Sequence, residues 1–173
     1  MERLIDSLRL RHHLAPEDYA TLLEGAAEGP LLAYAMQAAR EVAVGRLGTG
    51  VFIRGLIEIT NYCRNDCIRR SNRRVERYRL SKEEILACCR LGNTIGFRTF
   101  VLQGGEDAAL SDDWIEEVVN AIRREFPDNA ITLSLGERSR EAYERFFRAG
   151  ADRYLLRHET ATREHYAQLH PAA

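Results

Sequence analysis

The chain has no apolar run long enough to cross a membrane and no excess of charge of either sign. Its 173 residues include 25 Lys and Arg and 26 Asp and Glu. A bilayer span needs about 20 mostly apolar residues, and nucleic acid or an anionic membrane surface attracts a clustered positive field. We therefore expect no transmembrane segment and no binding to nucleic acid or to a membrane.

Cysteine is scarce, and the chain does not begin with a secretory signal pattern. Residues 1–6 mix charged and apolar residues, whereas a signal has a basic start followed by an apolar core. Four cysteines in such a chain favour metal binding or reduced thiols over structural disulfides. We expect a reducing, cytoplasmic location.

The N-terminal part of the chain has the pattern of helices. Asp18 to Leu23 follow Pro16, and proline is favourable at the start of a helix. Apolar residues then recur at helical spacing, namely Leu31, Leu32, Ala35, Met36, Ala39 and Val42. Gly45 and Gly48 end this pattern, so residues 1–48 are predicted to form an N-terminal helical segment.

Residues 49–173 alternate between β-branched apolar runs and amphipathic stretches. The predicted strands are residues 51–59, 99–103, 130–135 and 153–157, and the predicted helices are residues 81–96, 112–126, 140–149 and 162–169. Four βα units in succession favour a parallel sheet covered by helices. The predicted fold class is α/β: a partial (β/α) TIM-type barrel of about four βα units, preceded by N-terminal helices.

Four strands are too few to close such a barrel. A complete barrel has about eight strands, and a sheet that does not close leaves unpaired backbone groups along its edges. We expect a fragment, a half-barrel that self-associates through its open edge, or a domain that needs a partner.

Polar residues follow every predicted strand. In a parallel barrel, the loops at the carboxyl ends of the strands carry the functional residues. These polar stretches are residues 61–67, 104–107, 134–137 and 157–160. Because the carboxyl ends of parallel strands share one rim, the four stretches are predicted to converge on a ligand site.

Cys63 and Cys67 lie four positions apart in the loop after the first predicted strand. Thiolates suit both iron–sulfur clusters and zinc. The pair alone leaves three interpretations open: cluster ligands, zinc ligands or ordinary loop thiols. A zinc module is disfavoured, because no second Cys or His pair follows at the usual spacing.

The residues around this pair resemble the cluster loop of radical S-adenosylmethionine enzymes. The matching blocks are residues 61–67, 69–72 and 78–81. Other blocks resemble the iron-iron hydrogenase maturase branch of that superfamily, namely residues 51–59, 101–107, 132–137 and 153–160. The resemblance extends over essentially the whole chain, but over only about the first half of such a protein.

The resemblance implies an activity. Such an enzyme cleaves S-adenosylmethionine reductively to a 5′-deoxyadenosyl radical, which attacks a small-molecule substrate during assembly of the hydrogenase cofactor. The implied cofactors are a [4Fe-4S] cluster and S-adenosylmethionine, and the implied partners are other hydrogenase maturation proteins. The expected location of this activity is the cytoplasm.

The resemblance also implies ligand residues. Cys63 and Cys67 would bind the cluster, and the Gly104, Gly105 and Glu106 turn would hold the methionine amino group. Ser134 would face the ligand. Arg157 and Glu159 would meet the substrate carboxylate and the ribose hydroxyls.

The cluster loop departs from the superfamily pattern C-x3-C-x2-C. About four residues are missing after Cys67, so that Arg70 stands where the third cysteine belongs. A guanidinium has no lone pair to give to iron, and the loop therefore does not supply three thiolates. Cys88 or Cys89 is predicted to pack in the core with Ile85, Gly92 and Ile95, not to replace the missing ligand.

This departure keeps two alternatives open. The first is a catalytically inactive barrel fragment without a complete cluster. The second is an enzyme similar to methylornithine synthase, which has a similar cluster loop. Residues 133–137 and 155–160 favour the maturase branch over this second alternative.

Overall fold

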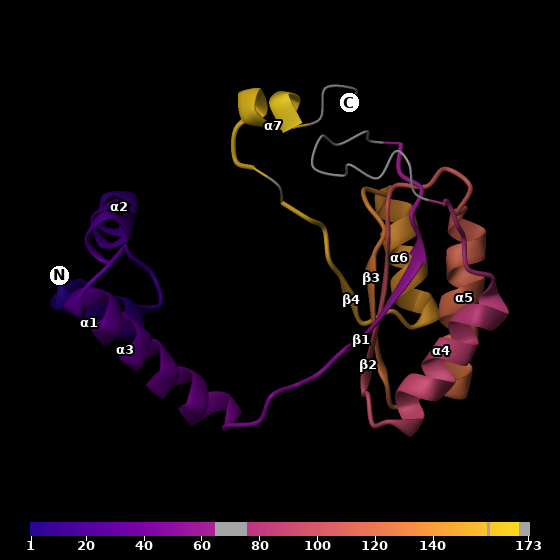
Figure 1. The fold of residues 1–173 in the computed structure, drawn as a ribbon, viewed down its shortest axis with the longest axis horizontal. Helices are drawn as coiled ribbons and strands as arrows, with labels where there is room; N and C mark the ends of the chain where they lie inside the picture. The colour runs from indigo at the N-terminus through magenta and orange to yellow at the C-terminus, as the bar shows by residue number, and fades with distance from the viewer. Residues whose placement is uncertain (65–75, 159, 170–173) are drawn as a thin grey trace. The chain divides into compact units, whose positions relative to one another are not determined.

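The structure is a computed structural model that describes residues 1–64, 76–158 and 160–169. The chain divides into two compact units, Met1–Phe52 and Ile53–Ala173. Figure 1 shows the order of helices and strands along the chain. Within the described ranges, no helix has the length and apolar character needed to cross a bilayer.

The N-terminal unit consists of three helices, α1 (Glu2–Arg11), α2 (Pro16–Gly25) and α3 (Pro30–Leu47). Proline begins both α2 and α3, where its fixed φ suits the helix and its missing N–H leaves no hydrogen bond unmade. Ile5, Leu22 and Ala38 form a small apolar core between the helices. The helical pattern read from the sequence thus agrees with the structure.

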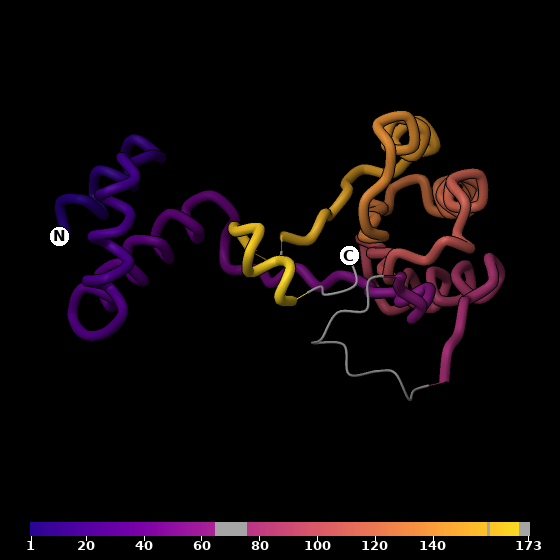
Figure 2. The backbone as a smooth tube through the Cα atoms, turned by 90° about the horizontal axis from the view of Figure 1, so that it is seen from above, coloured from indigo at the N-terminus to yellow at the C-terminus, as the bar shows by residue number. Residues whose placement is uncertain are grey.

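The second unit is a four-stranded parallel sheet, and the helices that follow its first three strands cover one side of it (Figures 1 and 2). Its strands pair in sequence order and are β1 (Gly55–Thr60), β2 (Thr99–Gly104), β3 (Ala130–Ser134) and β4 (Arg153–Tyr154). The helices that follow them are α4 (Lys82–Thr94), α5 (Asp112–Glu125), α6 (Arg140–Ala149) and α7 (Arg163–Leu169). The predicted α/β fold with four βα units is confirmed.

The core of this unit lies between the sheet and helices α4, α5 and α6. Its fully buried side chains include Ile59, Phe100, Leu102, Ile131 and Leu133 from the strands and Ile85, Ile115, Val119, Ile122 and Phe146 from the helices. Cys89 belongs to this core, as the helical spacing predicts, whereas Cys88 is exposed. The prediction for Ile95 is wrong. It is 63% exposed because α4 ends at Thr94 and the chain turns at Gly96, whose φ is +97°.

Two strands differ by more than one residue from their predicted ranges. The first begins at Gly55, because its pairing with β2 starts with Gly55 opposite Phe100 and residues 51–54 have no neighbouring strand there. The fourth ends at Tyr154 rather than at residue 157. Leu155 still donates its N–H to the Leu133 carbonyl, but β3 ends at Ser134 and the chain then turns at Gly136.

The two faces of the sheet differ in character. Side chains alternate between the faces of a strand, so Ile57 and Ile59 point to the helices while Leu56 and Glu58 point the other way. Leu56 is 60% exposed, which shows that its face is open at β1. Further along the same face, Glu58 pairs with Gln103 and Gln103 with Ser134.

Candidate functional site

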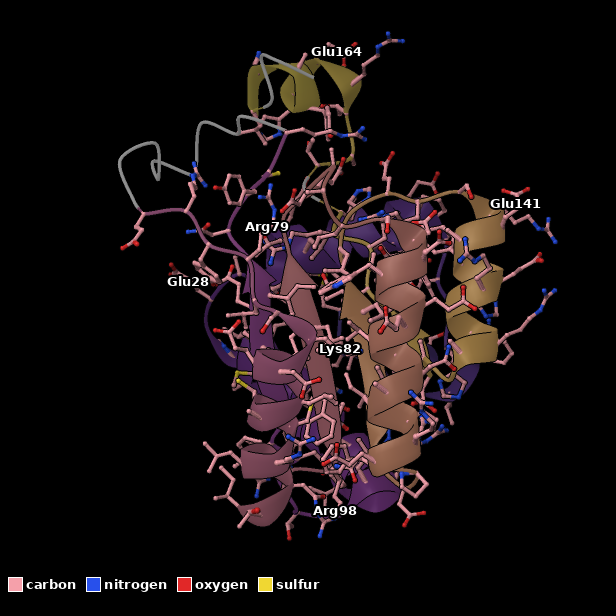
Figure 3. The ribbon with its side chains drawn as sticks, turned by 90° about the vertical axis from the view of Figure 1, so that its right-hand side faces the viewer. Glu28, Arg79, Lys82, Arg98, Glu141 and Glu164 are labelled. Carbon is pink, nitrogen blue, oxygen red and sulfur yellow. The ribbon has the colours of Figure 1, made fainter. Side chains whose placement is uncertain are left out.

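The loop after β1 and the turn after β2 meet at the carboxyl end of the sheet. The ladder between the two strands shifts register between Glu58 and Thr60, which brings Thr60 opposite Gly104. Such irregularities are common at barrel rims, where they redirect the chain. Figure 3 shows Arg79 at this end of the sheet and Arg98 at the opposite end.

Gly105 lets the two loops approach each other closely. A Cβ atom at Gly105 would lie only 2.5 Å from the Cβ of Cys63 and would also collide with the Tyr62 carbonyl oxygen. No larger residue fits without moving the loop, so glycine is needed for this close approach of the two loops. The structure thereby places Cys63 directly beside the glycine turn.

Glu106 contacts the loops that follow three successive strands. Arg64, from the loop after β1, donates from Nε to Glu106 Oε2 at 2.8 Å, and its backbone N–H donates to the Glu106 carbonyl at 3.0 Å. Gly136, from the loop after β3, lies against the Glu106 side chain, because a Cβ there would be 2.8 Å from Glu106 Cδ. The Glu106 side chain is 18% exposed, so a small ligand can still reach it.

A hollow of about 100 Å³ opens beside Glu106. Arg64, Leu135, Glu137 and Arg138 are among the residues that line it. Arg138 is held by Asp112 and by the Leu110 carbonyl, each at 3.0 Å from its Nη1. The hollow is therefore lined by three carboxylates, those of Glu106, Asp107 and Glu137, and by two guanidinium groups, which suits a small ligand that carries both an ammonium and a carboxylate.

Asp107, which also lines this hollow, is a buried acid. Arg79 donates to both of its oxygens, at 2.7 and 3.0 Å, and the Thr60 hydroxyl donates to Oδ2 at 2.8 Å. The hydrogen bonds from Arg79 outweigh the effect of burial and lower the pKa of Asp107 to about 2. Asp107 is thus a carboxylate at every physiological pH.

Sequence reasoning gave no role to Thr60, Arg64 or Arg79. Two signals were present in the sequence. Thr60 is a polar residue at the end of a mostly apolar strand, and Arg79 lies within the block 78–81 that resembles the superfamily. Neither signal indicates that Thr60 and Arg79 contact Asp107, because these contacts join segments that are 28 to 47 residues apart.

The other predicted site residues have different positions. Ser134 is buried on the sheet face away from the helices, beside Gln103. Arg157 is exposed in the segment after β4. Cys67 and Glu159 lie outside the described residues. The structure therefore brings together Cys63, Gly104, Gly105 and Glu106 at one rim, with Ser134 at the end of the neighbouring strand.

The residues present do not fit a [4Fe-4S] cluster held by three thiolates of one loop. The described residues contain no group of three His, Cys, Asp or Glu side chains arranged to hold a metal. Cys89 is no substitute, because it is fully buried in the core and burial raises the pKa of its thiol to about 12. By contrast, Glu106 and the glycine turn do fit the ammonium group of an amino acid.

Comparison with curated proteins gives two kinds of relative, although no protein family model matches the chain. The chain is 44% identical over 137 residues to the [FeFe] hydrogenase maturase subunit HydE of Thermotoga maritima, covering 77% of this chain and 39% of that protein. It is 30% identical over 136 residues to 3-methylornithine synthase of Methanosarcina acetivorans, covering 76% and 39%. The chain thus spans less than half the length of these relatives.

Solved structures show the same fold. A crystal structure of methylornithine synthase (PylB) matches with a TM-score of 0.82 at 28% identity, over 96% of this chain and 50% of that one. The structure of HydG, a maturase of the [FeFe]-hydrogenase, also matches with a TM-score of 0.82, at 22% identity, over 98% of this chain and 39% of that one. The fold of this chain corresponds to a part of these barrels.

Sequence identity and fold agree on one class of protein. The chain belongs to the radical S-adenosylmethionine superfamily, as the blocks around Cys63 and Gly105 indicate. Within the superfamily it falls in the [FeFe] hydrogenase maturase branch, and it corresponds to part of the length of such a protein.

Proposed function

We propose that this chain provides the S-adenosylmethionine-binding rim of a radical S-adenosylmethionine protein that acts in assembly of the [FeFe] hydrogenase cofactor. Glu106 would accept the hydrogen bonds of the methionine ammonium. The position of Glu106, where the loops after β1, β2 and β3 meet, is the observation that carries this proposal. A small-molecule substrate and other maturation proteins would be its partners.

Charge and shape at Glu106 support ammonium binding. A carboxylate and an ammonium form a charge-assisted hydrogen bond, which is stronger than a neutral one. Gly104 and Gly105 carry no side chain that would keep the ligand from the backbone of the turn. In the structure, the Arg64 guanidinium occupies the place of a cationic partner for Glu106, and the ammonium would share or replace it.

We do not assign the reductive cleavage of S-adenosylmethionine to the loop after β1. A [4Fe-4S] cluster would supply the electron that cleaves the sulfonium, but the sequence offers two cysteines where three are needed. What these residues can do on their own is bind and orient the methionine end of the nucleotide. Ser134 and Arg157 would extend the site toward the substrate, and Glu159 toward the ribose.

Methylornithine synthase is the second candidate within the superfamily. The 3-methylornithine synthase of Methanosarcina acetivorans is 30% identical to the chain. The maturase subunit HydE is 44% identical over a segment of similar length. The maturase function is therefore the better supported of the two. A barrel that binds the nucleotide but forms no radical is the third candidate, and the missing thiolate favours it for the chain as it stands.

Anaerobic reconstitution with iron and sulfide, together with S-adenosylmethionine titration, tests the proposal. We expect calorimetric titration to detect S-adenosylmethionine binding that Glu106→Gln weakens and Glu28→Gln leaves unchanged. Glu28 is an exposed acid of the N-terminal unit and serves as the matched charge control. Wild-type protein that does not bind the nucleotide, or equal binding by both variants, would show that the proposed site is wrong.

Iron content separates the candidates. About four irons per chain, with an electron paramagnetic resonance signal of the reduced cluster that changes on adding S-adenosylmethionine, would support radical chemistry. Nucleotide binding without iron would support the barrel that forms no radical. Stoichiometric zinc in a colourless protein would instead support a zinc site at Cys63 and Cys67.

A further inference from the structure

Asp107 joins the two loops that carry Cys63 and Glu106. Its side chain is only 3% exposed, at the end of the turn that follows β2. Both carboxylate oxygens accept hydrogen bonds from Arg79, and Oδ2 also accepts one from Thr60, the last residue of β1. A bidentate ion pair of this kind fixes the relative orientation of the guanidinium and the carboxylate as well as their separation.

Arg79 belongs to the end of the loop that begins with Cys63. It forms an antiparallel bridge with Thr60, and the next residue, Leu80, donates its N–H to the Ile59 carbonyl at 2.8 Å. The guanidinium also lies over the Tyr62 ring, with Cζ 3.8 Å from the ring centroid. The Arg79 side chain, at the end of the loop, thus contacts both the start of the loop and the turn after β2.

These contacts lead directly to the two candidate ligand residues. Tyr62 precedes Cys63 in the chain, and Asp107 follows Glu106. The backbone N–H of Asp107 donates to the Gly105 carbonyl at 3.0 Å, which holds the turn in shape. The Arg79–Asp107 pair therefore contacts residues adjacent in the chain to both Cys63 and Glu106.

We propose that Arg79 and Asp107 are positioning residues, which hold Cys63 and Glu106 at a fixed separation through their contacts with Thr60 and Tyr62. We call these four residues, Thr60, Tyr62, Arg79 and Asp107, the clasp. Its effect on S-adenosylmethionine rests on the proposed function, whereas its effect on Cys63 does not. Neither Arg79 nor Asp107 needs to touch the ligand for this role.

A second ion pair in the same unit allows a matched comparison. Arg123 pairs with Asp152 at 2.7 Å, and Asp152 also accepts the Ile131 N–H at 2.7 Å. Asp152 and Ile131 stand at the amino ends of β4 and β3, at the end of the sheet opposite the rim. Asp152→Asn therefore breaks an Asp–Arg pair that joins chain segments, without touching either loop of the candidate site.

Alkylation of Cys63 measures the clasp without any ligand. In a Cys67→Ser, Cys88→Ser background, Cys63 is the reactive thiol, because Cys89 is fully buried and its thiol pKa is about 12. We expect Asp107→Asn to raise the alkylation rate of Cys63 about tenfold, since the freed loop opens by local unfolding. Asp152→Asn should stay within about twofold of the parent at an equal distance below its melting temperature. An unchanged rate in Asp107→Asn, or an equal rise in both variants, would overturn the proposal.

Nucleotide affinity tests the consequence for the site in the full wild-type chain. We expect Asp107→Asn to weaken S-adenosylmethionine binding about tenfold, and Arg79→Lys, which keeps the charge but loses the fork, to weaken it less. If wild-type protein binds no nucleotide, the proposed function fails while the alkylation rates still decide the role of the clasp. If Asp107→Asn binds as tightly as wild type, the clasp does not position Glu106, and the proposed function stands.

Discussion

Gly105 is the residue at which the loop after β1 and the turn after β2 come closest. A methyl group there would overlap Cys63 and the Tyr62 carbonyl. We expect Gly105→Ala to destabilise the protein by about 1–3 kcal/mol, the usual range for forcing extra volume into a packed contact. Urea unfolding followed by circular dichroism measures this change.

Gly45 offers the matched control for that substitution. It lies inside α3, and a Cβ at Gly45 would meet nothing within 4 Å. Gly45→Ala should therefore stabilise the N-terminal unit by about 0.5–1 kcal/mol, because alanine has the higher helix propensity. Equal effects of the two substitutions would show that the close approach at Gly105 does not exist in solution.

Asp107 should make stability depend on pH in the acid range. Its pKa in the folded protein is about 2, below the ordinary value of 3.8. A depressed pKa stabilises the folded state above the unfolded value, and this contribution is lost as the pH falls toward the folded value. The shift corresponds to about 2 kcal/mol at pH 6, and about half of that should be gone at pH 3.

Comparison with Asp107→Asn isolates this contribution from the other acids. We expect the difference in unfolding free energy between wild type and the variant to shrink between pH 6 and pH 3. Chemical denaturation at several pH values measures it. A difference that stays constant over this range would mean that Arg79 does not hold the Asp107 carboxylate in solution.

At the scale of elements, α4 begins directly after the chain segment that returns to β1. Ser81 is its N-cap, and its hydroxyl accepts the Glu84 N–H, while the Glu84 carboxylate accepts the Ser81 N–H at 2.7 Å. We expect Ser81→Ala to destabilise the βα unit by about 1 kcal/mol. Ser81→Asp, which keeps an N-cap acceptor, should restore most of the loss in a thermal unfolding experiment.

The elements that the sequence predicted well are those defined by local patterns. The capping residues at Ser81 and the apolar spacing of residues 112–126 depend on neighbours within one or two turns, and α4 and α5 begin and end close to the predicted residues. The end of β4 depends on how far β3 extends beside it, which the residues of β4 do not encode. The clasp was missed for the same reason, because Thr60, Arg79 and Asp107 meet only after the sheet has formed.

At the scale of the molecule, the sheet face away from the helices has an exposed apolar side chain on β1, and two more exposed apolar side chains follow β4. Leu56 on β1 is 60% exposed, and Leu155 and Leu156 after β4 are each 51% exposed. These residues lie at the first and last strands of a sheet of four strands, where a closed barrel has about eight. Two such sheets in one assembly would supply eight strands and cover both edges.

We therefore predict that the 173-residue chain self-associates through this face. Sedimentation velocity over a range of concentrations should show a species of twice the monomer mass, and Leu56→Glu should shift it toward monomer, because burying an unpaired carboxylate is strongly unfavourable. Leu23→Glu, at an exposed position of α2 in the N-terminal unit, is the control that should leave the mass unchanged. A wild-type chain that stays monomeric at all concentrations, or an equal shift in both variants, would exclude the open sheet face as the contact.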